Sequence, residues 1–154
     1  MRTLLCLLVL FSVNARAAIF PVTITAKIQS QASEYVAVQI WSPFCGPCGE
    51  EVQELNKALE HSNGISGKKL SVLGVPVQSR KKEINAFIEH FHPNYEQLTA
   101  AQDTEEFFKT SAIPWTILFS GKERSKVKEW HGKINAVELL AEIERLDQNK
   151  KREQ

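Results

Sequence analysis

The sequence predicts an α/β domain in which a central mixed sheet lies between helices. Its 154 residues match one ordinary domain, and a hydrophobic content of 43% is enough to form a core. The expected elements run strand–helix–strand, then further helices, then strand–strand–helix. The first part needs a parallel strand pair joined by a crossover helix, whereas the last part needs an antiparallel hairpin. A mixed sheet flanked by helices satisfies both requirements.

The N-terminus predicts a signal peptide over residues 1–17 that is not part of the domain. Arg2 supplies a positive charge, residues 4–13 form an apolar run, and Ala15 and Ala17 are small residues at the two positions that a signal peptidase reads. The alternative is an uncleaved membrane anchor, but the run is well short of the roughly 20 residues that a spanning helix needs. We therefore expect a periplasmic or otherwise exported protein whose domain covers residues 18–147.

The first half of the domain carries two predicted strands with a helix between them. Residues 35–41 are β-branched and aromatic enough for a buried strand, and residues 70–77 form the next apolar run. Between them, the side chains that recur at helical spacing up to about His61 are Val52, Leu55, Ala58 and Leu59. Residues 19–33 alternate more weakly, and from this alternation we expect an edge strand.

The middle of the chain predicts additional helices. An amphipathic helix ends before Pro93 and carries Ile84, Phe87, Ile88 and Phe91. Asp103 and Glu106 have the spacing of a capping box at the start of a short helix. The segment between Val77 and Ile113 is therefore expected to be an extra helical insertion before the next strand.

The last third predicts a hairpin followed by a helix. Residues 115–120 form a strand, and residues 126–130 pair back on it after a turn. Asn135 and Glu138 have the spacing to cap a final amphipathic helix. We expect residues 148–154 to form a polar, frayed tail.

Two cysteines stand at the start of the first predicted helix, directly after a strand. There the Cys45 sulfur would face unpaired backbone N–H groups and the positive end of the helix dipole, and both favour the thiolate. Cys48 lies one turn further on, so one thiol can attack a disulfide while the other resolves the product. Pro47 stiffens the first turn without losing an N–H, and Gly46 allows a second chain to approach closely.

Two other interpretations of the cysteine pair remain open. A purely structural disulfide would close too short a loop to stabilise the fold much. A zinc site needs four ligands, and neither a second cysteine pair nor a histidine pair at a typical spacing accompanies Cys45 and Cys48. The third cysteine, Cys6, lies in the expected signal peptide. A single close pair in an exported protein therefore favours redox chemistry.

The segment Trp-Ser-Pro-Phe-Cys-Gly-Pro-Cys, residues 41–48, resembles the thioredoxin active site. Ala112-Ile113-Pro114, followed by an apolar strand, resembles the cis-proline loop of that family. The helical insertion and the export signal are more similar to the TlpA/ResA-like branch of exported thiol–disulfide oxidoreductases. The resemblance covers nearly the whole chain after the signal peptide and implies a thioredoxin fold.

This resemblance implies a role for each matching residue. Cys45 would be the nucleophile, Cys48 the resolving thiol, and Pro114 a cis-proline beside which the substrate backbone pairs. Glu51 matches a glutamate that the TlpA/ResA-like branch uses near its thiols; its alternative is a solvated position on a charged helix face. The expected substrate-binding residues are Trp41, Phe44, Gly46, Pro47, Ile113 and Trp115.

Four positions depart from the family pattern, and one of them is Gln53, which stands where the family has a helix-kinking proline. Gln39 stands where thioredoxins keep a buried aspartate that helps to deprotonate the resolving thiol, so Glu51 or water would have to take that role. Phe44 replaces the usual tryptophan and keeps an apolar docking surface. Trp115, where threonine is common, would either line the groove or belong to the core.

The Gly-Pro dipeptide between the cysteines favours a reductase, because thioredoxin is far more reducing, at about −270 mV, than DsbA, at about −120 mV. The resemblance implies a membrane thiol reductase of the DsbD or CcdA type as electron donor. The expected substrates are exported proteins with disulfides, such as apocytochrome c. We expect a monomer with no metal and no cofactor beyond the Cys45–Cys48 disulfide.

Three alternatives stay open for the function. The protein could form disulfides as an oxidase, hold Cu(I) through its thiolates, or act as a redox-silent interaction module. Nucleic acid is not an expected partner, because 19 lysines and arginines balance 18 aspartates and glutamates without a basic stripe.

Overall fold

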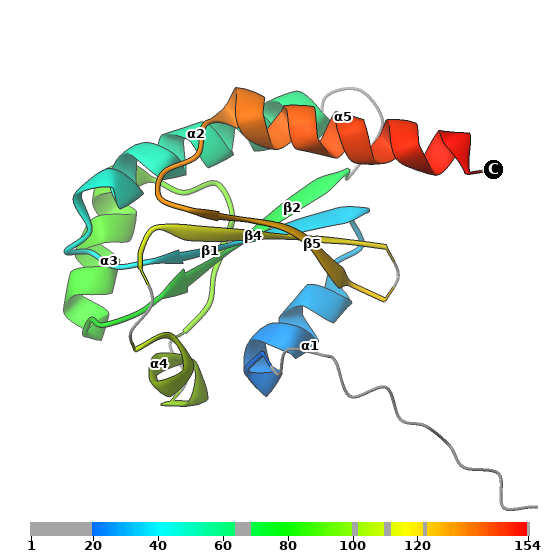
Figure 1. The fold of residues 1–154 in the computed structure, drawn as a ribbon. Coiled ribbons are helices and arrows are strands. Elements are labelled where there is room, and N and C mark those ends of the chain that lie inside the picture. Colours follow the sequence, from blue (N-terminus) through cyan, green and yellow to red (C-terminus); the bar gives the residue numbers. More distant parts are fainter. Residues whose placement is uncertain (1–19, 64–68, 100–101, 110–111, 122, 154) are drawn as a thin grey trace, which may run out of the picture.

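The ribbon in Figure 1 is a computed structural model that describes residues 20–63, 69–99, 102–109, 112–121 and 123–153. The expected signal peptide lies outside the described residues. Within the described ranges, no helix is long and apolar enough to cross a membrane.

The described part of the chain contains a five-stranded sheet made of β1 Tyr35–Trp41, β2 Leu70–Pro76, β3 Glu96–Gln97, β4 Trp115–Ser120 and β5 Ser125–His131. The strand order is β3-β2-β1-β4-β5. β1 is parallel to β2, and β2 to β3, whereas β4 is antiparallel to both β1 and β5. The expected parallel pair and hairpin are confirmed, and the short edge strand β3 is an addition that the sequence pattern did not predict.

The helices that flank the sheet in the described ranges are α1 Val22–Ser30, α2 Gly46–Asn63, α3 Lys81–Phe91, α4 Gln102–Phe108 and α5 Ala136–Arg152. In Figure 1, α2 and α5 cover one face of the sheet, and α1 and α4 lie on the other. α3 packs beside α2, with which it shares a buried cluster. The expected helical insertion before the cis-proline strand is present as α3, β3 and α4.

β1 is the central strand that positions the site, and it is buried along its whole length. Val36 and Val38 pack toward α1 and α4, whereas Tyr35 and Ala37 pack toward α2 and α5. A one-residue slip would exchange these two sets, so the register of a strand buried on both faces is strongly specified. The turn at its C-terminal end, which carries Cys45, therefore has a defined position.

The expected edge strand over residues 19–33 is wrong, because its described part forms α1. Ile24 and Ile28 lie about one helical turn apart, and both are buried against the sheet, at 1% and 3% exposure. Apolar residues at every second position also place two side chains four residues apart. The periodicity therefore fitted a helix as well as a strand.

The frayed tail expected over residues 148–154 is also wrong, because α5 continues to Arg152. Lys150, near its end, donates to the Tyr35 hydroxyl at 3.2 Å and to Glu34 Oε1 at 2.9 Å. These bonds join the last turns of α5 to the start of β1. Long-range contacts therefore keep a polar segment helical.

The two predicted helix caps have different outcomes. Asn135 caps α5 as expected, since its side chain accepts the Glu138 N–H at 2.9 Å. The short helix α4 begins at Gln102, so Asp103 lies in its first turn and not before it.

Candidate active site

The start of α2 holds a disulfide between Cys45 and Cys48, whose Cα atoms are 5.4 Å apart. α2 begins at Gly46, so Cys45 occupies the position just before the helix. The Cys45 N–H donates to the Ser42 carbonyl at 3.0 Å, and the Cys48 N–H to the Cys45 carbonyl at 3.2 Å. Backbone bonds thus close the turn and hold Cys45 at the positive end of the helix dipole.

The two cysteines differ in their access to solvent. Cys48 is fully buried, whereas Cys45 is half-buried and is followed by exposed Gly46 and Pro47. An external disulfide can therefore reach the Cys45 side of the pair and not the Cys48 side.

Aromatic rings cover the Cys48 side of the disulfide. Trp41, at the end of β1, stacks on Phe87 of α3 with 4.1 Å between ring centroids, and Phe91 follows at 4.5 Å. These rings belong to the cluster that buries Cys48. A Cβ atom on Gly49 would lie 2.2 Å from the Phe91 ring, so the missing side chain is what allows α3 to pack this closely on α2.

Trp41 does not reach the surface, although the sequence placed it among the substrate-binding residues. It is 1% exposed, and its indole N–H donates to Gln97 Oε1 on β3 at 3.0 Å. The structure therefore makes Trp41 a buried support beneath the disulfide.

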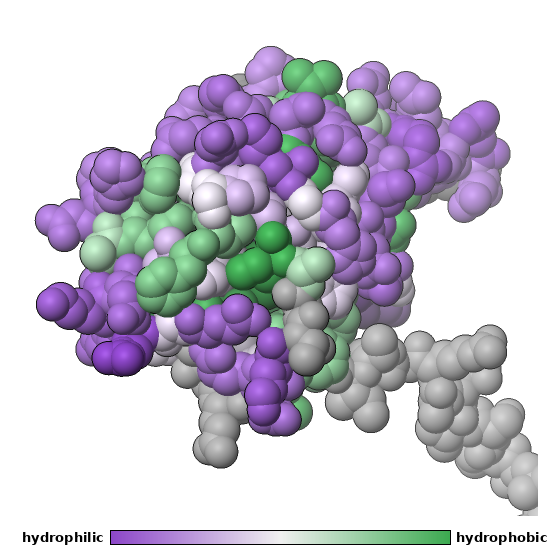
Figure 2. All heavy atoms as spheres, turned by 60° about the vertical axis from the view of Figure 1, so that its left-hand side comes forward, coloured by the Kyte–Doolittle hydropathy of each residue, from purple (hydrophilic) through white to green (hydrophobic). Residues whose placement is uncertain are grey.

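Apolar surface surrounds Cys45 on its open side. Phe44 is 72% exposed, and Ile113 lies half-buried in the loop that precedes β4. Figure 2 shows apolar side chains gathered on the side of the molecule where α3 and the start of α2 lie. An exposed aromatic ring within apolar surface is typical of a binding face.

The loop before β4 supplies the second expected part of the site. The Ile113–Pro114 peptide bond is cis, as the resemblance implied. Trp115, the next residue, pairs with Ile40 near the end of β1. The cis-proline loop therefore lies beside the strand end from which the Cys45 turn departs.

The side chain of Trp115 packs on the α1 and α4 side of the sheet. Its ring meets Phe108 of α4 edge-on at 5.6 Å and stacks on His131 of β5 at 5.0 Å. It packs against the cluster that lies under α1 and α4. Of the two positions left open for Trp115, the structure favours the core.

Glu51 is fully buried, so the solvated alternative for this residue is wrong. Its Oε1 accepts the Ile134 backbone N–H at 3.1 Å, and its Oε2 accepts the Gln39 side-chain amide at 2.8 Å. Burial raises the pKa of this carboxyl, against the opposing effects of these two bonds and of the charge on Lys133. Cys48 lies one turn earlier on the same buried face of α2. A carboxyl with raised proton affinity thus accompanies the buried sulfur.

Gln39 is also buried, and it joins Glu51 to a residue that the sequence analysis missed. The Tyr95 hydroxyl donates to Gln39 Oε1 at 2.7 Å. Burial and the nearby charge of Glu51 raise the pKa of Tyr95 well above its usual value, so the phenol keeps its proton. Tyr95 lies between α3 and β3, where neither periodicity nor a motif marks it. A buried amide that needs partners was the only available signal.

The arrangement offers nucleophilic attack and proton transfer. It brings together a half-buried sulfur at a helix start, a buried second sulfur, a buried carboxyl and a cis-proline loop. In the part of the chain that the structure describes, no three histidine, cysteine, aspartate or glutamate side chains are grouped so as to hold a metal ion.

Neither a family model nor a curated protein sequence matches this chain, but solved structures do. A secreted disulfide oxidoreductase of Mycobacterium tuberculosis, homologous to E. coli DsbE, has a TM-score of 0.58 at 13% identity, over 73% of this chain and 81% of that one. StoA from Bacillus subtilis has a TM-score of 0.58 at 16% identity, over 71% and 82% of the two chains. The thioredoxin domain of a thiol-disulfide oxidoreductase from Bacteroides vulgatus reaches 0.61 at 21% identity, over 79% and 82%.

The chain has the thioredoxin fold. The sheet order, the position of the disulfide and the cis-proline loop agree with this assignment. The expectation from the active-site segment and the cis-proline loop is therefore confirmed at the level of the fold.

Proposed function

We propose that this protein is an exported, periplasmic thiol–disulfide oxidoreductase that reduces disulfides in other exported proteins. The observation that carries the proposal is a half-buried Cys45 joined to a fully buried Cys48 at the start of α2, beside the cis-proline loop. The solved structures that share this fold include disulfide oxidoreductases, which supports the same chemistry.

In the reduced protein, Cys45 attacks the substrate. The helix start lowers the pKa of its thiol and supplies the thiolate. This thiolate bonds to one sulfur of a substrate disulfide. The other substrate sulfur leaves as a thiolate and takes up a proton.

Cys48 resolves the mixed disulfide. Its thiol gives its proton to the carboxylate of Glu51, and the resulting thiolate attacks the sulfur of Cys45. The Cys45–Cys48 bond forms, and the second substrate sulfur leaves and is protonated. Two electrons have then passed from the dithiol of the protein to the disulfide of the substrate.

The substrate docks on the apolar surface around Cys45. An extended segment pairs its backbone with the loop at Pro114, while Phe44 and Ile113 offer apolar contacts. The space around Gly46 is open, since a Cβ atom there would meet nothing within 4 Å. A substrate backbone can therefore approach the disulfide closely.

Each turnover oxidises the pair, so an electron donor is part of the proposal. A reductase in an oxidising compartment must have its dithiol restored by a reducing partner. We assign this role to a membrane thiol reductase of the DsbD or CcdA type. Apocytochrome c is the substrate class that the resemblance suggests first.

Trapping tests the proposal. The Cys48→Ser variant keeps the attacking thiol but cannot resolve, so it should accumulate mixed disulfides through Cys45. Mass spectrometry of bands from non-reducing gels identifies the partners. Cys45→Ser is the matched control and should trap nothing, because Cys48 is buried.

A redox titration of the unaltered protein tests the direction of electron flow. We expect a potential near the thioredoxin value of about −270 mV, together with reduction of insulin. A potential near about −120 mV, with oxidation of a reduced peptide, would reverse the direction. A cysteine pair that does not interconvert in any mild thiol couple would remove the enzyme assignment altogether.

A further inference from the structure

Three side chains form a hydrogen-bonded line that ends one helical turn from Cys48. Tyr95 donates to Gln39 Oε1 at 2.7 Å, and Gln39 Nε2 donates to Glu51 Oε2 at 2.8 Å. The second oxygen of Glu51 accepts the Ile134 backbone N–H at 3.1 Å. A backbone N–H can only donate, whereas an amide side chain can donate or accept. Of these two partners, Gln39 is therefore the one that can change its role.

Hydrogen bonds join the segment that carries Tyr95 to α2, the helix that begins directly after Cys45. Gln53 and Asn56 of α2 donate to backbone carbonyls at the end of α3, at 2.8 and 3.0 Å. Asn56 also accepts the Asn94 N–H at 2.8 Å. α2 therefore fixes where the Tyr95 hydroxyl lies relative to Glu51.

We propose that Tyr95 is a positioning residue that acts through Gln39 to keep Glu51 hydrogen-bonded both with and without its proton. This inference rests on the function proposed above, in which Glu51 receives the proton of Cys48. When Glu51 is ionised, the bonds run as the structure shows them. When it is protonated, the Gln39 amide turns over. Glu51 then donates to Gln39 Oε1, and Gln39 Nε2 donates to the Tyr95 oxygen.

The neutrality of Gln39 and Tyr95 is what makes this reversal possible. An amide and a phenol each contain a donor and an acceptor, so no buried polar atom of the line is left unpaired in either state. An aspartate at position 39 could not donate to an ionised Glu51, and its own charge would repel that carboxylate. The departure from the thioredoxin pattern thus has a physical role.

The charged groups around Glu51 are engaged elsewhere. Lys133, in the loop before α5, pairs with Glu50. Glu54, the next acidic residue on α2, accepts a backbone N–H at the start of α5 at 3.0 Å and pairs with a lysine of its own helix. From β4, the uncharged hydroxyl of Thr116 faces the same carboxyl.

The Tyr95→Phe variant tests the inference. The bond from the phenol polarises the amide that donates to the ionised carboxyl, so its loss disfavours the ionised state more than the protonated one. Reduced protein is mixed with 5,5′-dithiobis(2-nitrobenzoate), so that attack by Cys45 releases one thionitrobenzoate and resolution by Cys48 releases a second. The pH at half-maximal rate of the second release should rise by about one unit. The pH profile of the first release should stay unchanged.

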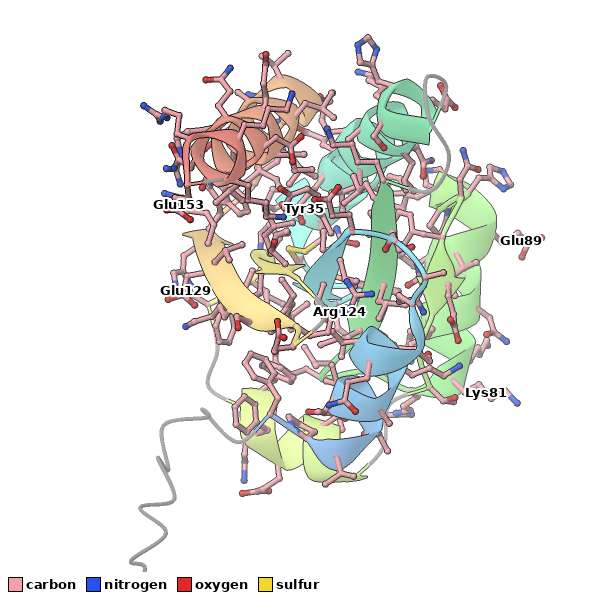
Figure 3. The ribbon with its side chains drawn as sticks, turned by 90° about the vertical axis from the view of Figure 1, so that its right-hand side faces the viewer. Tyr35, Lys81, Glu89, Arg124, Glu129 and Glu153 are labelled. Atoms are coloured by element: carbon pink, nitrogen blue, oxygen red, sulfur yellow. A yellow bond between two sulfur atoms is a disulfide. The ribbon has the colours of Figure 1, made fainter. Side chains whose placement is uncertain are left out.

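Tyr35→Phe is the matched control. The Tyr35 hydroxyl donates to Asp147 at 2.7 Å at the other end of β1, where Figure 3 shows the residue between the sheet and α5. Like Tyr95→Phe, this variant removes one phenol oxygen from the side of the sheet that α2 and α5 cover. Both release profiles should overlay those of the unaltered protein. Gln39→Met should raise the second midpoint as well. Adding Tyr95→Phe to Gln39→Met should produce no further shift, because the effect of Tyr95 passes through the amide.

The outcomes separate this inference from the proposed function. A Tyr95→Phe or Gln39→Met profile that overlays the unaltered one overturns the inference and leaves the enzyme assignment intact. Additive shifts in the double variant overturn it too, because Tyr95 would then act by another route. Absence of the second release in the unaltered protein would instead contradict the dithiol mechanism itself.

Discussion

Two polar networks lie on the same face of the sheet, at opposite ends of β1, and they differ in the charge of their partners. At the end away from the disulfide, the Tyr35 hydroxyl donates to Asp147, which also pairs with Lys69. At the disulfide end, the Tyr95 hydroxyl donates to a neutral glutamine, which donates to Glu51. Each network thus joins a tyrosine to a carboxylate. Among the described residues, a lysine contacts the carboxylate of the first network, and none contacts that of the second.

The pKa values of the two carboxyls are shifted in opposite directions, because the balance between burial and hydrogen bonding differs. Burial opposes the ionisation of Asp147, but hydrogen bonds from Lys69 and Tyr35 outweigh it and lower the pKa. At Glu51 burial outweighs the neutral hydrogen-bond donors, and the pKa is raised. A carboxyl that is held charged fastens α5 to the sheet, whereas one with raised proton affinity can accept and return a proton. The contact with a lysine therefore distinguishes Asp147, which has a structural role, from Glu51, which can accept a proton.

The largest expected difference between the two networks is in the kinetics of thionitrobenzoate release from the Glu51→Gln and Asp147→Asn variants. Glu51→Gln removes the proton acceptor, so we expect the second thionitrobenzoate release to slow by about 100-fold, the lower range for loss of a general base. Asp147→Asn removes a carboxylate of the far network and should leave both releases unchanged. Equal slowing in both variants, measured by stopped flow, would show that the effect is general and not a property of the site.

Gly49→Ala tests whether the packing of α3 on α2 excludes water from the network at the disulfide end of β1. The added methyl group would collide with the Phe91 ring, so either this ring or α3 with it must move away from Gly49. We expect a loss of about 1–3 kcal/mol in urea unfolding, as is usual for overpacking. We also expect a lower midpoint for the second release, because water at Glu51 lowers its pKa. Gly46→Ala is the control for stability, since its methyl group meets nothing within 4 Å and should not lower the urea midpoint. Equal stabilities for the two variants would show that Phe91 yields without cost.

The pH dependence of stability should have opposite signs in the two networks. The pKa of Asp147 lies below its ordinary 3.8 in the folded protein, so its contribution is present above about pH 3.8 and is lost as the pH falls through the folded value. The pKa of Glu51 lies above its ordinary 4.5, so its contribution is present below about pH 4.5 and is lost as the pH rises through the folded value.

At pH 7, Asp147→Asn should therefore lower Tm and Glu51→Gln should raise it, each by roughly 2–6 °C. Below about pH 4 the advantage of Glu51→Gln should vanish, because the native carboxyl is then protonated too. Differential scanning calorimetry at several pH values measures both effects. Equal signs at pH 7 would contradict the contrast between the networks.

Local sequence signals were sufficient for the frame of the fold. The apolar run of β1, the Cys45–Cys48 turn and the hairpin of β4 and β5 depend on neighbouring residues, and each appears where the sequence placed it. α1 was mistaken for a strand because two buried isoleucines four residues apart fit both periods. The end of α5 was mistaken for a frayed tail because its helicity depends on contacts of Lys150 with the distant Tyr35.

The candidate site was less predictable, because two of its features arise from the insertion. Trp41 belongs to the conspicuous active-site segment, yet Gln97 and the rings of α3 bury it. Tyr95 reaches Gln39 because side chains of α2 fasten the end of α3. No residue pattern within either segment indicates these contacts, since they depend on where the insertion packs against the rest of the domain.

Lys133 offers the smallest and most selective test of the comparison. It is the cation that acts on Glu51, but it pairs with Glu50 at the exposed surface and acts across solvent. Lys133→Gln should therefore raise the midpoint of the second release by less than about half a unit. Roughly 1 M salt should erase the difference, because the screening length is then about 3 Å. Lys69→Gln, which removes the lysine in contact with Asp147, should lower Tm and leave that midpoint unmoved.

If Lys133→Gln instead raised the midpoint by more than a unit at high salt, a lysine would control Glu51 as closely as Lys69 controls Asp147. Neutral partners could then not be what distinguishes the disulfide end of the sheet.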